Sequence, residues 1–191
     1  WPNDGELIEV ECSLATYDDM NNIDVFPLDA IDECDQDLEY EIVEGSVVLM
    51  SGGCLGTWYR QWMATDDCDN VSYADQYVRL LDTTMPTWDD LPADLGIAVN
   101  ANCEAAYDTS VTGVPTAHDN CDVCFDVNLT IEFSDADPVY TCEHDDDDQE
   151  GTRYIDRTWT VTDQCGNANT HVQRITLADE TAPEGYAYYV E

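Results

Sequence analysis

The chain has 191 residues, enough for one or two domains, and its 43 acidic residues against five basic ones give a formal net charge of −38. Such a field repels nucleic acid and anionic membrane surfaces and attracts hard cations such as Ca²⁺. A hydrophobic share of 43%, with five Trp and eleven Tyr, argues against a disordered chain.

Strand-like alternation is visible along the chain. Leu38, Tyr40 and Ile42 alternate with charged residues in the first half, and residues 127–133 alternate in the same way in the second. In the segment that begins at Arg157, the alternation places Trp159 and Val161 on one face. Short alternating runs separated by Gly, Asp, Asn and Pro are typical of β-sandwiches.

An internal repeat is the strongest signal. Residues 60–86 align without gaps with residues 157–183, and the shared positions include an arginine, a tryptophan, a glutamine and an Asp-x-Cys-x-Asn turn. The fold prediction is therefore all-β, with two tandem immunoglobulin-like β-sandwich domains stapled by disulfides. The first domain spans residues 1–88 and the second 89–183. An extra C-terminal strand spans 184–191.

The end of the second repeat, TWTVTDQCGNANTHVQRITLADETAP, closely resembles the end of hyalin-repeat (HYR-like) immunoglobulin-type domains. The resemblance implies an all-β sandwich, an extracellular location and an adhesive or structural role. The first repeat departs from the pattern, with Asp69 in place of Gly166 and Met85 in place of Ala182. We therefore expect its turn to differ.

The nine cysteines indicate an oxidising compartment. Four cysteines per repeat allow three pairings. Position in the repeat and the family resemblance favour pairing first with second and third with fourth. The pairs would be Cys12–Cys34, Cys54–Cys68, Cys103–Cys121 and Cys142–Cys165. Cys124 has no counterpart in the first repeat, and we interpret it as a buried free thiol or an intermolecular link.

Clusters of Asp supply candidate cation sites, with Ca²⁺ as the expected ion. Two interpretations stay open for them, solvated or hydrogen-bonded turns and true ligation. No EF-hand spacing is present. The candidates are Asp82, Asp89, Asp90, Asp119, Asp122, Asp145, Asp146, Asp147 and Asp148. Separately, two sequons make Asn70 and Asn128 candidate glycosylation sites, although Asn70 also suits a turn.

Catalysis is not expected. The three histidines, His118, His144 and His171, do not recur between the repeats, and no nucleophile, metalloprotease or phosphate-loop motif is present.

The tail EGYAYYVE resembles the opening strand of a repeat. We expect it to be donated to a neighbouring copy by β-strand addition, through Tyr186, Tyr188, Tyr189 and Val190. The main functional prediction is therefore a structural subunit of an extracellular filament, assembled head-to-tail from copies of itself. The alternative is an adhesive or binding module excised from a larger cell-surface protein and stabilised by Ca²⁺. A third class is a cation-storing acidic matrix protein.

Overall fold

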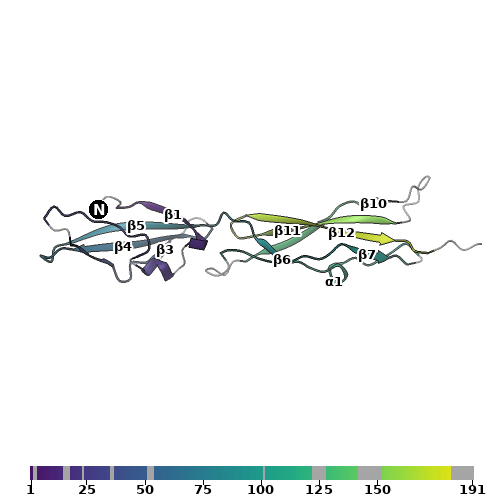
Figure 1. Ribbon diagram of the computed structural model, residues 1–191, viewed down its shortest axis with the longest axis horizontal. Helices are drawn as coiled ribbons and strands as arrows, with labels where there is room; N and C mark the ends of the chain where they lie inside the picture. Colours follow the sequence, from purple (N-terminus) through teal and green to yellow (C-terminus); the bar gives the residue numbers. More distant parts are fainter. Residues whose placement is uncertain are drawn as a thin grey trace, which may run out of the picture. The chain divides into compact units, whose positions relative to one another are not determined.

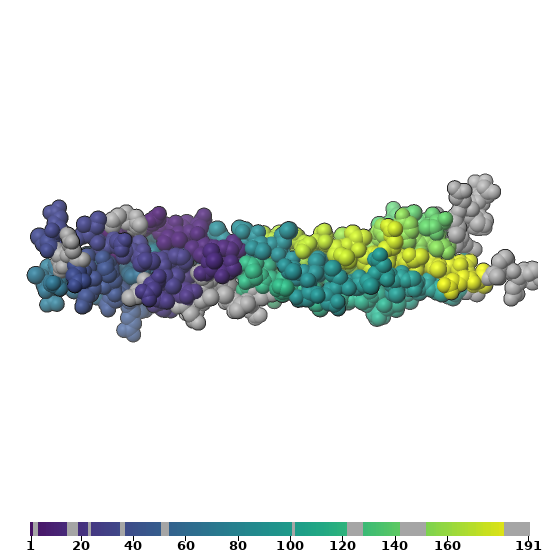
Figure 2. Space-filling view, viewed as in Figure 1, coloured from purple at the N-terminus to yellow at the C-terminus, as the bar shows by residue number. Residues whose placement is uncertain are grey.

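A computed structural model describes the chain as two compact units. The described residues are 1, 4–14, 18–22, 24–34, 37–50, 54–100, 102–121, 128–141 and 152–181, coloured by position in Figure 2. Unit 1 comprises the described parts of residues 1–86, 119–129 and 162–167, and unit 2 those of 87–118, 130–161 and 168–191. Two segments of the second sequence repeat, 119–129 and 162–167, thus belong to unit 1.

Unit 1 is built on a five-stranded sheet of order β1-β5-β4-β2, with β3 also pairing with β4 (Figure 1). β1 runs parallel to β5, whereas β4 pairs antiparallel with β2, β3 and β5. Two 3-10 helices, Cys12–Leu14 and Asp18–Asn21, follow β1. The strands are β1 (Leu7–Glu11), β2 (Glu39–Ile42), β3 (Val48–Met50), β4 (Thr57–Thr65) and β5 (Val71–Leu81).

Unit 2 repeats this plan in a sheet of order β10-β11-β12-β7, with β9 also pairing with β11. Its opening strand β7 again runs parallel to its last strand β12. β6 and β8 form a separate antiparallel pair, and α1 (Thr109–Thr112) is a single turn capped by Asp108. The strands are β6 (Thr87–Asp90), β7 (Leu95–Ala98), β8 (Thr116–His118), β9 (Thr130–Asp135), β10 (Val139–Tyr140), β11 (Arg153–Thr162) and β12 (Ala168–Ala178).

The cores follow from the alternation in the two long hairpin strands. In β4 and β11, every second side chain is buried, and Trp62 and Trp159 are each 1% exposed. Each indole Nε1 donates to a buried glutamine on the neighbouring strand, Gln76 at 3.0 Å and Gln173 at 3.2 Å. A buried indole N–H without an acceptor would lower the stability of the fold, and the two glutamines supply that acceptor. The predicted all-β class, with two β-sandwich-like sheet groups, is confirmed.

The first repeat's turn does not differ as expected. Asp69 adopts φ 64° and Gly166 φ 89°, so both turns place this residue in the left-handed region. Aspartate tolerates that conformation better than most side chains. The glycine-to-aspartate difference therefore leaves the turn geometry intact.

Candidate functional site

The turn from Asp163 to Asn167 connects β11 to β12 and forms one side of the site. The carboxylate of Asp163 accepts the backbone N–H groups of Cys165 at 2.7 Å and of Asn167 at 2.9 Å. The amide Nδ2 of Asn167 donates both to Asp163 Oδ2 at 2.8 Å and to the backbone oxygen of Asp82 at 3.0 Å. The turn is thus rigid and attached to the chain that follows β5.

A second Asp-x-Cys turn lies at the end of β8. Asp119 Oδ1 accepts the backbone N–H of Cys121 at 2.9 Å, and the Asp119 side chain is buried. This side-chain-to-backbone bond is the mechanism by which aspartate fixes turns. Both turns therefore present a cysteine in a defined direction.

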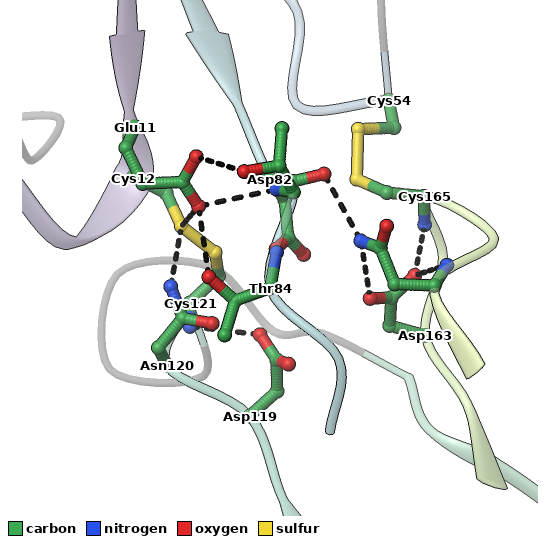
Figure 3. The surroundings of a disulfide bond; sticks show 12 residues. Glu11, Cys12, Cys54, Asp82, Thr84, Asp119, Asn120, Cys121, Asp163 and Cys165 are labelled. Carbon is green, nitrogen blue, oxygen red and sulfur yellow. Dashed lines mark hydrogen bonds between the residues drawn. A yellow bond between two sulfur atoms is a disulfide. The ribbon is translucent and has the colours of Figure 1, made fainter. Parts of the chain in front are cut away.

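These cysteines form the two disulfides, Cys12–Cys121 and Cys54–Cys165 (Figure 3). The expected pairing of cysteines within each repeat is therefore wrong. Its physical error is that the turns holding Cys121 and Cys165 belong to unit 1, where they meet cysteines from the first sequence repeat.

The predicted partners Cys34, Cys68 and Cys103 are free thiols instead. Cys34 and Cys68 are exposed, and Cys103 is partly buried. Cys142 and Cys124 lie outside the described residues.

Four carboxylates gather around the disulfides, and Asp82 is at their centre (Figure 3). Its Oδ1 accepts the backbone N–H of Thr84 at 3.2 Å, whereas its buried Oδ2 has no hydrogen-bond partner among the described residues. Burial raises the pKa of Asp82 to about 6 against the hydrogen bond from Thr84, and the negative charges of Asp119, Asp163 and Glu11 raise it further. The cluster therefore favours a neutral Asp82 or a compensating cation.

The ligand atoms suit an oxygen-binding cation. One group of ligand atoms within 4.8 Å of one another comes from Glu11, Cys12, Asp82 and Cys121, and another from Asp82, Asp163 and Cys165. The sulfurs are held in disulfides and offer no thiolate, so the carboxylates carry the coordinating capacity. Carboxylate oxygens and an unpartnered Asp82 Oδ2 fit Ca²⁺, whereas a thiolate-selecting metal does not fit.

The structure separates the sequence-predicted candidates into different surroundings. Asp82 and Asp119 come together in unit 1. In unit 2, Asp89 lies 2.5 Å from His118 Nδ1, and Asp90 pairs in register with Thr116. The remaining candidates lie outside the described residues, namely Asp122, Asp145, Asp146, Asp147, Asp148, Tyr186, Tyr188, Tyr189 and Val190.

Both candidate glycosylation residues are exposed, and their modification remains a prediction. Asn70 also serves the turn, because its Nδ2 donates to Asp66 Oδ2 at 2.7 Å and its N–H to Asp66 Oδ1 at 2.8 Å. Asn128 lies two residues before β9 rather than within a strand.

Glu11 and Asp163 were missed as members of the site. Asp163 carried a usable signal, because it precedes a cysteine in the same Asp-x-Cys pattern as Asp119. Glu11 carried none, since its role depends on the chain after β5. Its carboxylate accepts the N–H of Thr83 at 3.2 Å, the hydroxyl of Thr83 at 3.0 Å and the hydroxyl of Thr84 at 3.4 Å.

Over the described ranges, every helix is too short to cross a bilayer.

Comparison with known proteins gives a distant likeness only. No family model and no curated protein matches the chain. The Drosophila N-cadherin EC1-4 structure is 13% identical over 92% of this chain and 47% of its own, with a TM-score of 0.39. Human CDH23 EC21-23 is 15% identical over 91% and 67%, with a TM-score of 0.40. Human mucin-like protocadherin EC1-2 is 12% identical over 94% and 97%, with a TM-score of 0.35.

Proposed function

We propose that the chain is a non-catalytic, adhesive or structural tandem-repeat module of an extracellular surface protein. The observation that carries the proposal is the pair of disulfides, which join Cys12 and Cys54 to turns of the second sequence repeat. Disulfides persist in oxidising, extracellular settings. A module that transmits tension between its ends benefits from covalent links that survive unfolding of its strands.

Single-molecule pulling tests this role directly. The Cys54–Cys165 disulfide closes a sequence separation of 111 residues. Reduction should therefore lengthen the fully unfolded chain by about 380 Å, at about 3.4 Å per residue. Pairing within each repeat would release only about 260 Å by the same measure. The shorter gain, or none, would contradict the covalent linkage on which the proposal rests.

A divalent cation is the second element of the proposal. Ca²⁺ held by Glu11, Asp82 and Asp163 would neutralise carboxylates that otherwise repel one another. Calorimetry should detect Ca²⁺ binding with a Kd of about 10⁻⁴–10⁻³ M, the range of extracellular modules. Asp82→Asn should abolish this binding, while Asp90→Asn, at an exposed candidate in β6, should not. If the wild-type protein binds no Ca²⁺ at millimolar concentration, the cation is not part of the proposed function.

Filament formation through residues 184–191 remains a prediction, because the tail lies outside the described residues. Deletion of residues 184–191 should abolish head-to-tail assemblies in electron micrographs. Unaffected filaments would exclude strand donation by the tail.

A further inference from the structure

Two turns of unit 1 reproduce the two cysteine-bearing turns of the site. In the first pair, Cys34 N–H donates to Asp32 Oδ1 at 2.8 Å, as Cys121 N–H donates to Asp119 Oδ1 at 2.9 Å. Asp32 and Cys34 therefore form the same turn as Asp119 and Cys121.

The second pair of turns matches even more closely. Asp66 accepts from Cys68 N–H at 2.9 Å, from Asn70 N–H at 2.8 Å and from Asn70 Nδ2 at 2.7 Å. The corresponding bonds to Asp163 are 2.7, 2.9 and 2.8 Å. The turns around Cys34 and Cys68, the acceptor turns, are thus built like those around Cys121 and Cys165.

Exposure distinguishes the two sets. Asp119 and Cys121 are 4% and 0% exposed, whereas Asp32 and Cys34 are both exposed. In the second pair the contrast is smaller, because Asp163 is 6% exposed and Cys165 partly buried, whereas Asp66 is partly buried and Cys68 exposed. One set is covered by Cys12, Cys54, Asp82 and their neighbours, and the other set presents two free thiols to solvent.

Apolar surface accompanies these thiols. Ile31 is 76% exposed and Val71 47% exposed, and both line the same hollow of unit 1. A cavity of about 110 Å³ opens beside them. Its lining includes Ile31, Asp32, Asp66, Asn70 and Val71.

The complementary surface is present in unit 2. Asp179 Oδ1 accepts Thr181 N–H at 2.9 Å, as Asp82 Oδ1 accepts Thr84 N–H at 3.2 Å. Asp179 is exposed, whereas Asp82 is 7% exposed. The residues after β12 thus form the same turn as the residues after β5. The aspartate of the turn after β5 is buried in the site of unit 1, whereas that of the turn after β12 is exposed.

The free thiol Cys103 belongs to the same surface. It lies after β7, as Cys12 lies after β1. The turn that carries it is closed by a hydrogen bond from Asn100 N–H to Glu104 O at 2.8 Å, and Cys103 N–H donates to Asn100 O at 2.9 Å. Cys103 is thus carried by a hydrogen-bonded turn that is separated from β7 by residues 99–102, whereas Cys12 follows β1 directly.

We propose that a second copy of this chain docks its Cys103 and Asp179–Thr181 surface on the acceptor turns, with an interchain disulfide between Cys34 and Cys103. The template is the covered pair of turns within unit 1, where Cys121 is bonded to Cys12. By the same template, Asn70 Nδ2 donates to the backbone oxygen of Asp179 of the second copy, as Asn167 donates to that of Asp82. This inference rests on the proposed tandem-module function and extends it to assembly between chains.

The bond forms by thiol–disulfide exchange with a low-molecular-weight disulfide as the two-electron oxidant. The Cys103 thiolate attacks that disulfide, forms a mixed disulfide and releases one small thiolate. The Cys34 thiolate of the neighbouring copy then displaces the second small thiolate. Two protein thiols are oxidised and one small disulfide is reduced to two thiols.

The same comparison between repeats can be made for Cys68. Its equivalent Cys165 is bonded to Cys54, whose counterpart in the second repeat is Cys142. Cys142 lies outside the described residues, so the proposed bond joins Cys34 and Cys103. The experiment nevertheless also replaces Cys68 and Cys142.

Two complementary full-length variants test the proposal, one with Cys34→Ser and Cys68→Ser, the other with Cys103→Ser and Cys142→Ser. Each is incubated with oxidised glutathione, alone and mixed, at moderate salt to screen repulsion between chains. Wild-type chain should form a ladder of covalent multimers on a non-reducing gel. Each variant alone should stay monomeric, and the mixture should give a covalent heterodimer and nothing larger. Cys124→Ser, at the cysteine without a repeat counterpart, is the matched control and should keep the ladder.

Peptide mapping of the heterodimer should recover a Cys34–Cys103 cross-link. A wild-type chain that stays monomeric with its thiols capped by glutathione would overturn the proposal. So would a Cys34–Cys68 bond within one chain, or dimers of the second variant alone through Cys34–Cys34. The same digest reports Cys12–Cys121 and Cys54–Cys165. Monomers that retain both pairs would refute only this assembly, whereas their absence would refute the proposed function itself.

Discussion

Arg60 in unit 1 and Arg157 in unit 2 occupy equivalent repeat positions and are 1% and 2% exposed, yet their charges are compensated differently. Arg60 donates to Gln76 Oε1 at 2.6 Å and to backbone carbonyls between Met20 and Phe26, and no carboxylate of the described residues is among these acceptors. Arg157 forms a two-pronged pair with Asp135, at 2.6 and 2.8 Å. The repeat thus preserves the buried cation but not its counter-charge.

The difference shows in the proton affinity of the two side chains. Burial lowers the pKa of Arg60 to about 10, whereas the hydrogen bonds from Arg157 to Asp135 raise the pKa of Arg157 above its ordinary value. Both guanidinium groups also lie over the ring of the shared tryptophan, at 4.9 Å from Trp62 and 5.9 Å from Trp159. Unit 1 therefore depends on carbonyl dipoles where unit 2 depends on one carboxylate.

The largest expected effect comes from removing that carboxylate. Asp135→Asn leaves Arg157 buried without its counter-charge and should lower the free energy of unfolding of unit 2 by about 3–5 kcal/mol. Chemical denaturation followed by Trp fluorescence measures the loss. Asp137→Asn, at an exposed neighbour, should change stability by less than about 0.5 kcal/mol. Equal effects of the two substitutions would mean that Arg157 is compensated as Arg60 is.

The next largest difference in stability is expected between substitutions of the equivalent glutamines Gln76 and Gln173. Gln76 Oε1 accepts from both Arg60 and Trp62, whereas Gln173 Oε1 accepts from Trp159. Gln76→Ala should therefore cost about 2–3 kcal/mol, roughly 1 kcal/mol more than Gln173→Ala, because it leaves a buried charged donor unsatisfied. Urea titrations of the two variants give the comparison. A larger loss for Gln173→Ala would contradict the account of Arg60.

A smaller contrast is expected between the covered and uncovered turns. Asp163→Ala removes bonds that position Cys165 and Asn167 in a partly buried turn and should cost about 1–2 kcal/mol. Asp66→Ala removes the same bonds in an exposed turn, where water replaces them, and should cost less than about 1 kcal/mol. Thermal unfolding of both variants measures the difference. Equal losses of stability would show that burial of the Asp163 turn does not strengthen its hydrogen bonds.

The last contrast depends on pH. Since the pKa of Asp82 is raised to about 6 in the folded chain, the folded state holds a proton that the unfolded state releases. Its stabilising contribution is complete below the unfolded pKa of about 3.8 and is lost as pH rises through 6. In chelator, Asp82→Asn should remove this pH dependence and raise the free energy of unfolding at pH 7, by about 3 kcal/mol at most. Asp179→Asn, at the exposed equivalent, should do neither.

Much of the fold was predictable from the sequence, and less of the site. Alternation identified the strand around Trp159, and the ungapped repeat identified the Asp-x-Cys-x-Asn turns. The pairing of Cys12 and Cys54 was not predictable, because four cysteines per repeat do not reveal which repeat supplies the partner. The environment of Asp82 was equally hidden, since its burial depends on turns that lie far along the chain.

The disulfide pattern has a combinatorial consequence. It bonds the first cysteine of one repeat to the second cysteine of the next repeat, as in Cys12–Cys121. It likewise bonds the third cysteine of one repeat to the fourth cysteine of the next repeat, as in Cys54–Cys165. Because the pairing is shifted by one repeat, a gene that gains or loses a whole repeat keeps every internal cysteine matched. The number of repeats can therefore change by one without leaving an unpaired cysteine inside the array of repeats. Conversely, the loss of a single cysteine weakens two repeats at once.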